Sequence, residues 1–399
     1  MNRLTTTIAA LGIVAGGTAG ADEVRIGSVA GITGPIADLI EPIVGGRNLA
    51  AAHVNAEGGL LGGDTMVMVQ GDSACDPKAA VDAGTKVINV DRVVAVVGPS
   101  CSGATSAFTQ SVSIPAGVVA VSDSATAPSL TRLEDDDLFF RVAASDAYQG
   151  RALARLVLDK GYRTVSVTAA NDDYNAAIGK VFAVEYAKMG GTIASSGVHE
   201  PNKASYRSEV ASMKKKGAEA LVVFAYYGSS GITIMRNALE TGLFSSFFGA
   251  DGMADTSVIE QLGAENLKKT YITTVAADDG TEAYARFAEA AEAEGLPPGA
   301  PFVAQGYDAA FLLALAIEQA GSADRAAIPA ALRAVANAPG EPILPGEWEK
   351  AKRLIAAGED IDYHGASGEI EFDDNGDVAG VYAVNTVGPD GTWMAEPLD

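Results

Sequence analysis

The chain has 399 residues, of which 48% are hydrophobic and 20% are charged, as in an ordinary globular protein. Its formal net charge of −23 argues against nucleic acid and anionic membrane surfaces as partners. The length suggests two domains or one large one.

Residues 1–21 are typical of a secretory signal peptide. Arg3 gives a positive start, an apolar stretch follows over 8–17, and Ala19-Gly20-Ala21 fits a cleavage site. The apolar stretch is too short to span a membrane, and no later run of the sequence is long enough. We therefore expect an exported, periplasmic protein that is not inserted in the membrane.

Two cysteines, Cys75 and Cys101, remain in this exported chain. An even number of cysteines in an oxidising compartment favours a disulfide. A metal pair would lack a nearby histidine, and His53, His199 and His364 show no metal-ligand spacing. We expect neither a metal nor a cofactor.

Strands and helices alternate along most of the chain. Strands are expected at 24–30, 66–69, 93–97, 118–122, 139–142, 165–168, 192–195, 221–225, 247–249 and 271–275. Helices are expected at 39–57, 76–90, 148–160, 175–189, 205–216, 232–241, 281–294, 303–320 and 323–335. Two successive runs of this kind predict two doubly wound domains with mostly parallel sheets and a ligand site between them.

The C-terminal part has a different pattern. Segments 369–372 and 381–385 flank Asp374-Asn375-Gly376-Asp377, which is typical of a β-hairpin turn.

Residues 93–106 are the first candidate for a binding site. A valine-rich strand ends at Gly98-Pro99, and small and hydroxyl residues then lead into a helix. Such a loop presents free backbone N–H groups at the carboxyl end of a strand, which suits a small anion. The chain has neither the phosphate-loop nor the dinucleotide glycine pattern, and a carboxylate is the other common small anion. Taken alone, Ser102 would more often be a helix cap than a ligand contact.

Several segments together resemble the periplasmic leucine/isoleucine/valine-binding proteins, the solute receptors of branched-chain amino-acid ABC importers. The matching segments are 72–78, 97–102, 122–131, 140–141, 146–150, 172–174, 226–228, 248–252 and 372–377. The resemblance spans essentially the whole mature chain.

This resemblance implies an α/β type I periplasmic-binding fold, in which two doubly wound parallel-sheet domains are joined by a three-segment hinge. The first domain would comprise 22–145 and 274–384, and the second 146–273 and 385–399. It further implies a monomeric receptor without catalytic activity that closes about its hinge on an amino acid and delivers it to a membrane permease.

The resemblance also implies a set of ligand-binding residues. Ser102 and Thr126 would bind the zone of the α-carboxylate and α-ammonium, together with the backbone at Ser124 and Ala125. From the second domain, Tyr174 and Tyr227 would cover the ligand. Asp251 would pair with the ammonium, and Phe302 would lie near the ligand's side chain. A zwitterion taken from water needs both a donor cluster and an acceptor, and these residues supply both.

The sequence departs from the family at three places. Asp251 stands where the family often has Glu, and Leu39 stands about where a first-domain aromatic is common. The segment 341–365, with Trp348, is longer than in the best-known members. The amino-acid class is therefore the firmer expectation, and amide or urea, GABA-like and aromatic-acid ligands stay open.

Two other functions fit parts of the pattern. A serine hydrolase using Ser102 would lack the G-x-S-x-G motif, because Ser100-Cys101-Ser102-Gly103-Ala104 does not match it. The same fold could also serve as a sensor domain that passes its signal to a partner.

Overall fold

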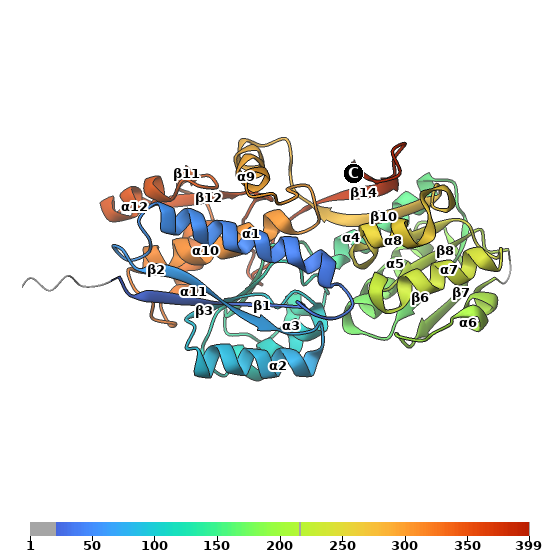
Figure 1. Ribbon diagram of the computed structural model, residues 1–399, viewed down its shortest axis with the longest axis horizontal. Coiled ribbons are helices and arrows are strands. Elements are labelled where there is room, and N and C mark those ends of the chain that lie inside the picture. Colours follow the sequence, from blue (N-terminus) through green and yellow to red (C-terminus); the bar gives the residue numbers. More distant parts are fainter. Residues whose placement is uncertain (1–20, 215–216, 399) are drawn as a thin grey trace, which may run out of the picture.

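The computed structural model describes residues 21–214 and 217–398. They form two lobes that lie end to end along the long axis (Figure 1). Apart from Ala21, the expected signal peptide lies outside the described residues. Within the described ranges, no helix combines the length and the apolar character that crossing a membrane requires.

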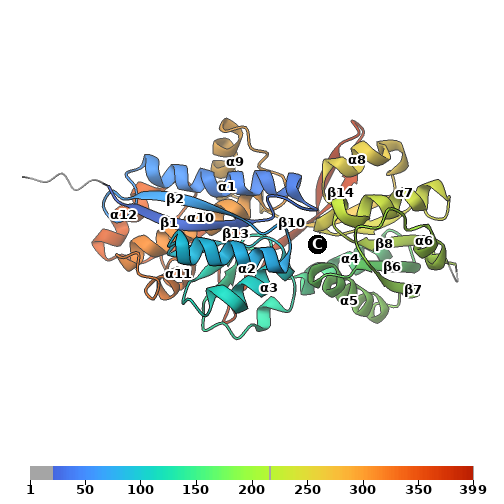
Figure 2. The same cartoon turned by 60° about the horizontal axis from the view of Figure 1, so that its bottom comes forward.

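The first lobe is built on a five-stranded parallel sheet of order β2-β1-β3-β4-β5. Its strands are β1 (Glu23–Ala30), β2 (Thr65–Asp72), β3 (Ala95–Val97), β4 (Ala120–Ser122) and β5 (Phe139–Arg141). Its helices are α1 (Ala37–Ala56), α2 (Pro77–Thr85), α3 (Ser102–Phe108), α9 (Glu282–Ala293), α10 (Val303–Ala320), α11 (Ile328–Ala336) and α12 (Trp348–Ala357). Helix α10 covers one face of the sheet and α2 with α3 the other (Figure 2). Burial on both faces explains the continuous valine runs of the short strands.

The second lobe is built on a seven-stranded sheet of order β15-β14-β10-β9-β8-β6-β7. Its parallel strands are β6 (Thr164–Ala170), β7 (Thr192–His199), β8 (Ala220–Phe224), β9 (Phe247–Gly249) and β10 (Thr270–Ala276). Two antiparallel strands, β14 (Val381–Val387) and β15 (Trp393–Leu398), complete one edge. Its helices are α4 (Asp146–Asp159), α5 (Asp173–Lys188), α6 (Arg207–Met213), α7 (Ile232–Glu240) and α8 (Thr256–Leu262). The prediction of two doubly wound α/β domains is therefore confirmed.

The chain passes between the lobes three times: between β5 and α4, after β10, and before β14. Both β10 and β14 belong to the second sheet, because β10 pairs with β9 on one side and with β14 on the other. Residues 274–276 and 381–384, expected in the first domain, therefore lie in the second lobe. The expected boundary between 384 and 385 falls inside β14.

The predicted hairpin around 374–377 is not formed. Strand β13 (Gly368–Glu369) pairs with β12 (Ile361–Gly365), whereas β14 pairs with β10 and β15. The turn lies before the third crossing, where the Asp377 carboxylate accepts hydrogen bonds from Nε and Nη2 of Arg141, both at 2.7 Å. An ion pair between a buried arginine and a partly buried aspartate holds this turn, in place of strand pairing.

The segment 341–365 forms ordered structure in the first lobe. Strand β11 (Glu341–Ile343) pairs with β12, and α12 connects them. Trp348 begins α12, is fully buried, and donates a hydrogen bond from Nε1 to the Gly59 carbonyl at 3.1 Å. The segment thus packs on the turn that follows α1.

Candidate functional site

A cavity lies between the lobes at the carboxyl ends of their strands, and both lobes line it. Its polar side chains are Ser100, Ser102, Ser124, Thr126, Tyr174 and Asp251. Its apolar ones are Ile36, Leu39, Ile40, Ile43 and Phe302, and Cys101, Tyr226 and Gly252 complete the wall. The cavity therefore has one polar part and one aliphatic part, which is what an amino acid with an apolar side chain requires.

The first lobe contributes hydroxyl groups from two loops at the sheet edge. Ser102 is the first residue of α3 but does not cap it. Cys101 occupies the N-cap position, and no side chain accepts a hydrogen bond from the first backbone N–H groups of the helix. The Ser102 Oγ instead accepts the Ala127 N–H at 3.1 Å and so joins the two loops. Since this oxygen already accepts one hydrogen bond, its own hydrogen is available to a ligand carboxylate.

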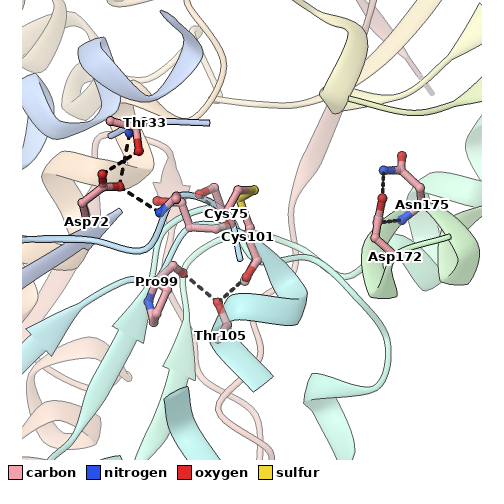
Figure 3. The surroundings of a disulfide bond; sticks show 12 residues. Thr33, Asp72, Cys75, Pro99, Cys101, Thr105, Asp172 and Asn175 are labelled. Atoms are coloured by element: carbon pink, nitrogen blue, oxygen red, sulfur yellow. Dashed lines mark hydrogen bonds between the residues drawn. A yellow bond between two sulfur atoms is a disulfide. The ribbon is translucent and has the colours of Figure 1, made fainter. Parts of the chain in front are cut away.

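The disulfide predicted between Cys75 and Cys101 is confirmed, with Cα atoms 5.4 Å apart (Figure 3). It ties the loop after β2 to the loop that opens α3. The hydroxyl of Thr105, on the first turns of α3, donates to the carbonyls of Pro99 and Cys101 at 2.8 and 3.0 Å. This loop is therefore held from both sides, by a covalent bond and by its own helix.

The second lobe contributes a buried carboxylate. Asp251 follows β9, and its Oδ2 accepts the hydroxyl of Tyr174 at 3.2 Å while its Oδ1 accepts the Val275 N–H at 2.9 Å. Burial raises the pKa of Asp251 to about 6, although these hydrogen bonds oppose the shift. A cationic ligand group beside the carboxylate would lower this pKa again.

Tyr174 and Tyr226 form an aromatic wall beside Asp251. Their rings are stacked, with centroids 5.6 Å apart and planes inclined by 19°. Tyr174 lies in the first turn of α5, where Asp172 caps the helix by accepting the Asn175 N–H at 2.8 Å (Figure 3). Burial raises the pKa of both phenols, so they serve as neutral hydrogen-bond groups.

A second carboxylate, Asp146, lies close behind the cavity. Within the described part of the chain, neither of its side-chain oxygens has a hydrogen-bond partner, although the side chain is fully buried. Burial raises its pKa well above the usual range, and the neighbouring Asp251 adds to the shift. An unpaired buried carboxylate is costly, so it marks a place where a cation would be stabilised.

The cavity brings together six of the expected residues: Ser102, Ser124, Thr126, Tyr174, Asp251 and Phe302. It does not include Ala125 or Tyr227. Ala125 lies behind the wall, where its carbonyl accepts a hydrogen bond from Arg141 at 3.3 Å.

Tyr227 was expected at the ligand, but the preceding residue, Tyr226, lines the cavity in its place. Tyr227 packs in the hydrophobic core instead, at the start of a single π-helical turn that precedes α7. Sequence reasoning also missed Asp146, although the residue lay inside a matched segment. An Asp directly at the expected first crossing between the domains was the sequence signal that could have found it.

The lobes touch directly beside the cavity. The Gly228 N–H of the second lobe donates to the Pro35 carbonyl of the first at 3.2 Å. A Cβ atom on Gly228 would lie 2.5 Å from that oxygen, so only glycine permits this approach. On another side, a Cβ on Gly103 would lie 3.1 Å from Oδ2 of Asp173. The structure therefore represents a closed arrangement of the lobes.

Two lobes linked by three crossings, with a polar and aliphatic cavity closed between them, define a receptor for a small solute. The family model for the receptor family ligand binding region matches residues 46–390, and the chain belongs to this family.

Curated relatives confirm the resemblance to the leucine/isoleucine/valine-binding proteins. The chain is 28% identical over 343 residues to the leucine-, isoleucine-, valine-, threonine- and alanine-binding protein of Pseudomonas aeruginosa, covering 83% of this chain and 88% of that one. It is 27% identical over 286 residues to the Leu/Ile/Val-binding protein of Escherichia coli K12, covering 71% and 76%.

Solved structures show the same type I periplasmic-binding fold. A leucine-binding protein from Thermotoga maritima has a TM-score of 0.79 at 24% identity, covering 94% of this chain and 99% of that one. A branched-chain amino-acid transporter substrate-binding protein from Streptococcus pneumoniae, solved with isoleucine, gives the same TM-score, identity and coverage.

Proposed function

We propose that this protein is a periplasmic receptor that captures an aliphatic α-amino acid by hinge closure and delivers it to the permease of an ABC importer. The supporting observation is the composition of the cavity wall. Hydroxyl groups of the first lobe face a buried carboxylate of the second, and an aliphatic surface lies beside them.

In this proposal the two lobes divide the zwitterion between them. Ser102, Ser124 and Thr126 bind the α-carboxylate through hydroxyl and backbone donors, with the backbone near Ala125 included. Asp251 binds the α-ammonium. Asp146 lies close to Asp251 and raises no barrier to a cation there, and charge-assisted hydrogen bonds offset the cost of taking both ligand charges from water.

The aliphatic part of the cavity supports a branched or linear apolar side chain. Ile36, Leu39, Ile40 and Ile43 come from the start of α1 and the residue before it, and Phe302 adds an aromatic ring to the same apolar cluster. The names of the curated relatives agree with this class. Leu39 stands about where a first-domain aromatic is common in the family, and it leaves this part of the wall aliphatic.

Differential affinity for the closed state drives the hinge motion. The ligand docks on the first lobe, and Tyr174, Tyr226 and Asp251 then arrive with the second. The protein acts as a monomer and performs no reaction on the ligand. Such a receptor works in the periplasm, after removal of residues 1–21.

Calorimetric titration of refolded, ligand-stripped protein tests the proposal. The panel contains Leu, Ile, Val, Ala, Phe, Glu and GABA, with L-leucinamide as the matched control that lacks a carboxylate. We expect saturable binding of the aliphatic α-amino acids and a large loss of affinity for the amide, whose weak binding is measured at high ligand concentration. Absence of binding across the panel would overturn the proposed ligand class.

A further inference from the structure

A fully buried arginine lies behind the carboxylate-binding loops of the first lobe. Arg47 belongs to α1 and is 0% exposed. Its partner is Asp123, which is equally buried and directly follows β4; Nε and Nη2 of Arg47 lie 2.7 and 2.6 Å from Asp123 Oδ2. The pair is electrically balanced, so it adds no net charge beneath the cavity.

The remaining N–H groups of Arg47 reach two further strand ends. Nη1 donates to Ser28 Oγ at 3.0 Å and to the Val29 carbonyl at 3.2 Å, near the end of β1. Nη1 also contacts the Val97 carbonyl at 3.5 Å, and Nη2 donates to Ser100 Oγ at 3.0 Å. One planar guanidinium thus joins the carboxyl ends of β1, β3 and β4.

The backbone beside Arg47 is shaped to admit this side chain. Gly98 has φ +95°, and a Cβ there would lie 2.0 Å from the Val29 carbonyl and 3.3 Å from Nη2 of Arg47. Any side chain at this position would push the loop away from the guanidinium. The glycine after β3 is therefore part of the same arrangement.

The cavity wall lies one hydrogen bond from this network. Ser100 contacts Arg47 directly, and the Ser124 hydroxyl donates to Asp123 Oδ1 at 2.9 Å and to the Ser100 carbonyl at 3.2 Å. Both serines line the cavity, and Ser102 and Thr126 follow them by two residues. Arg47 therefore holds groups that set the distance between the loop of Ser100 and Ser102 and the loop of Ser124 and Thr126.

We propose that Arg47 is a positioning residue for the ligand's carboxylate. This inference rests on the proposed function. Arg47 does not touch the ligand; its fork of donors fixes the distance between the loop of Ser102 and the loop of Thr126. Donors on two separate loops bind one carboxylate well only when both stay within a fraction of an ångström of their places.

The test replaces Arg47 by lysine. Arg47→Lys keeps a positive partner for Asp123, but an ammonium is a point charge and cannot join three strand ends at once. Affinities are measured for the panel amino acid that binds most tightly and for its amide. We expect the affinity for the amino acid to fall by about tenfold or more, because hydrogen bonds to a charged group weaken. The amide should change by less than about twofold, since it lacks the carboxylate.

Arg325→Lys is the matched control. Arg325 donates from Nε and Nη2 to the Val93 carbonyl at 3.2 and 2.6 Å and from Nη2 to the Ile88 carbonyl at 3.1 Å, at the opposite end of β3. The Arg325→Lys variant should lose stability in thermal unfolding, as Arg47→Lys does. Its ratio of the affinities for the amino acid and for the amide should stay at the wild-type value.

Ser28→Ala is a milder variant that removes one acceptor of Arg47 outside the cavity wall, and it serves if Arg47→Lys does not fold. We expect a selective loss of a few-fold for the amino acid. The proposal is overturned if the folded variants keep the wild-type affinity ratio, or if amino acid and amide weaken equally. Wild-type protein that binds no α-amino acid would overturn the proposed function, and this inference with it.

Discussion

At the scale of single residues, the buried carboxylates determine which ligand charge the second lobe accepts. Asp251 lies close enough to Asp146 to raise the pKa of that carboxyl, and Asp146 has no hydrogen-bond partner among the described residues. Their charge is balanced only when a cation or a proton is nearby. An amino acid's ammonium is such a cation.

We predict that Asp251→Asn removes most of the ligand affinity. Loss of one member of a buried charge pair costs about 3–5 kcal/mol, which is more than 100-fold in affinity. Asp255→Asn is the control, because Asp255 is a buried cap of α8 outside the cavity wall. Calorimetry with the panel amino acid measures both variants. Wild-type affinity in Asp251→Asn would contradict the assignment.

The raised pKa of Asp251, about 6, predicts a pH dependence of binding. The free receptor holds a proton on this carboxyl below that pH, whereas the ligand's ammonium needs the ionised form. Affinity should therefore rise with pH up to about 6 and level off above it. Titrations between pH 4.5 and 8 measure this, and Asp251→Asn should flatten the profile.

The raised pKa of Asp251 affects the stability of the free protein in the opposite direction: stability falls as pH rises, whereas ligand affinity rises. Because its pKa is higher in the folded chain than in the unfolded chain, Asp251 contributes less to stability as pH rises through this range.

A ligand affinity that falls as pH rises from 5 to 7 would show that the carboxyl binds in its protonated form.

At the scale of elements, loops after parallel strands carry the site, and fixed contacts hold them. The disulfide holds the loop after β2 against the start of α3, and α12 with its strands extends the first lobe behind α1. Both elements belong to the first lobe. The first lobe therefore presents a preformed half-site.

We predict that replacing both Cys75 and Cys101 by serine lowers stability and affinity together. The cysteines are 26 residues apart, and opening such a loop costs about 3.5 kcal/mol in the chain-entropy model. Affinity should fall as well, because Cys101 lies in the cavity wall. Urea unfolding and calorimetry measure the two effects, with wild type under reducing conditions for comparison. An unchanged unfolding midpoint would show that the bridge is dispensable.

At the scale of the whole molecule, function depends on how closely the two lobes approach. The contact between Gly228 and Pro35 exists only because the glycine has no side chain. Neither Pro35 nor Gly228 belongs to a sheet strand, although buried side chains of both lobes share one apolar cluster where the lobes meet. Closure can therefore be weakened without unfolding either lobe.

We predict that Gly228→Ala keeps both lobes folded but resists closure. Its Cβ would meet the Pro35 carbonyl, so the closed state loses stability, the ligand dissociates faster and affinity falls about tenfold. Small-angle X-ray scattering should show less compaction on ligand addition than in wild type. Gly299→Ala is the control, because its Cβ would have 3.9 Å to the nearest atom, Oη of Tyr284. Normal compaction in Gly228→Ala would refute the role of this contact.

Much of this protein follows from local sequence signals. Valine-rich strands alternating with helices predict two doubly wound lobes, because strands buried on both faces need continuous apolar residues. Two cysteines in a chain with an expected signal peptide predict their own pairing. Ser102 could be considered because small and hydroxyl residues follow a valine-rich strand, where such folds bind ligands. Thr126 and Asp251 were selected from the resemblance to the leucine/isoleucine/valine-binding proteins.

Tertiary structure alone decided the rest, because the remaining features depend on contacts between segments far apart in the chain. Whether Tyr226 or Tyr227 lines the cavity depends on how the chain turns after β8. That β10 and β14 both belong to the second sheet depends on their pairing with each other. The burial of Asp146 follows from packing at the first crossing, and the role of the turn at Asp377 from Arg141. The network of Arg47 joins residues up to 76 positions apart, which no local pattern encodes.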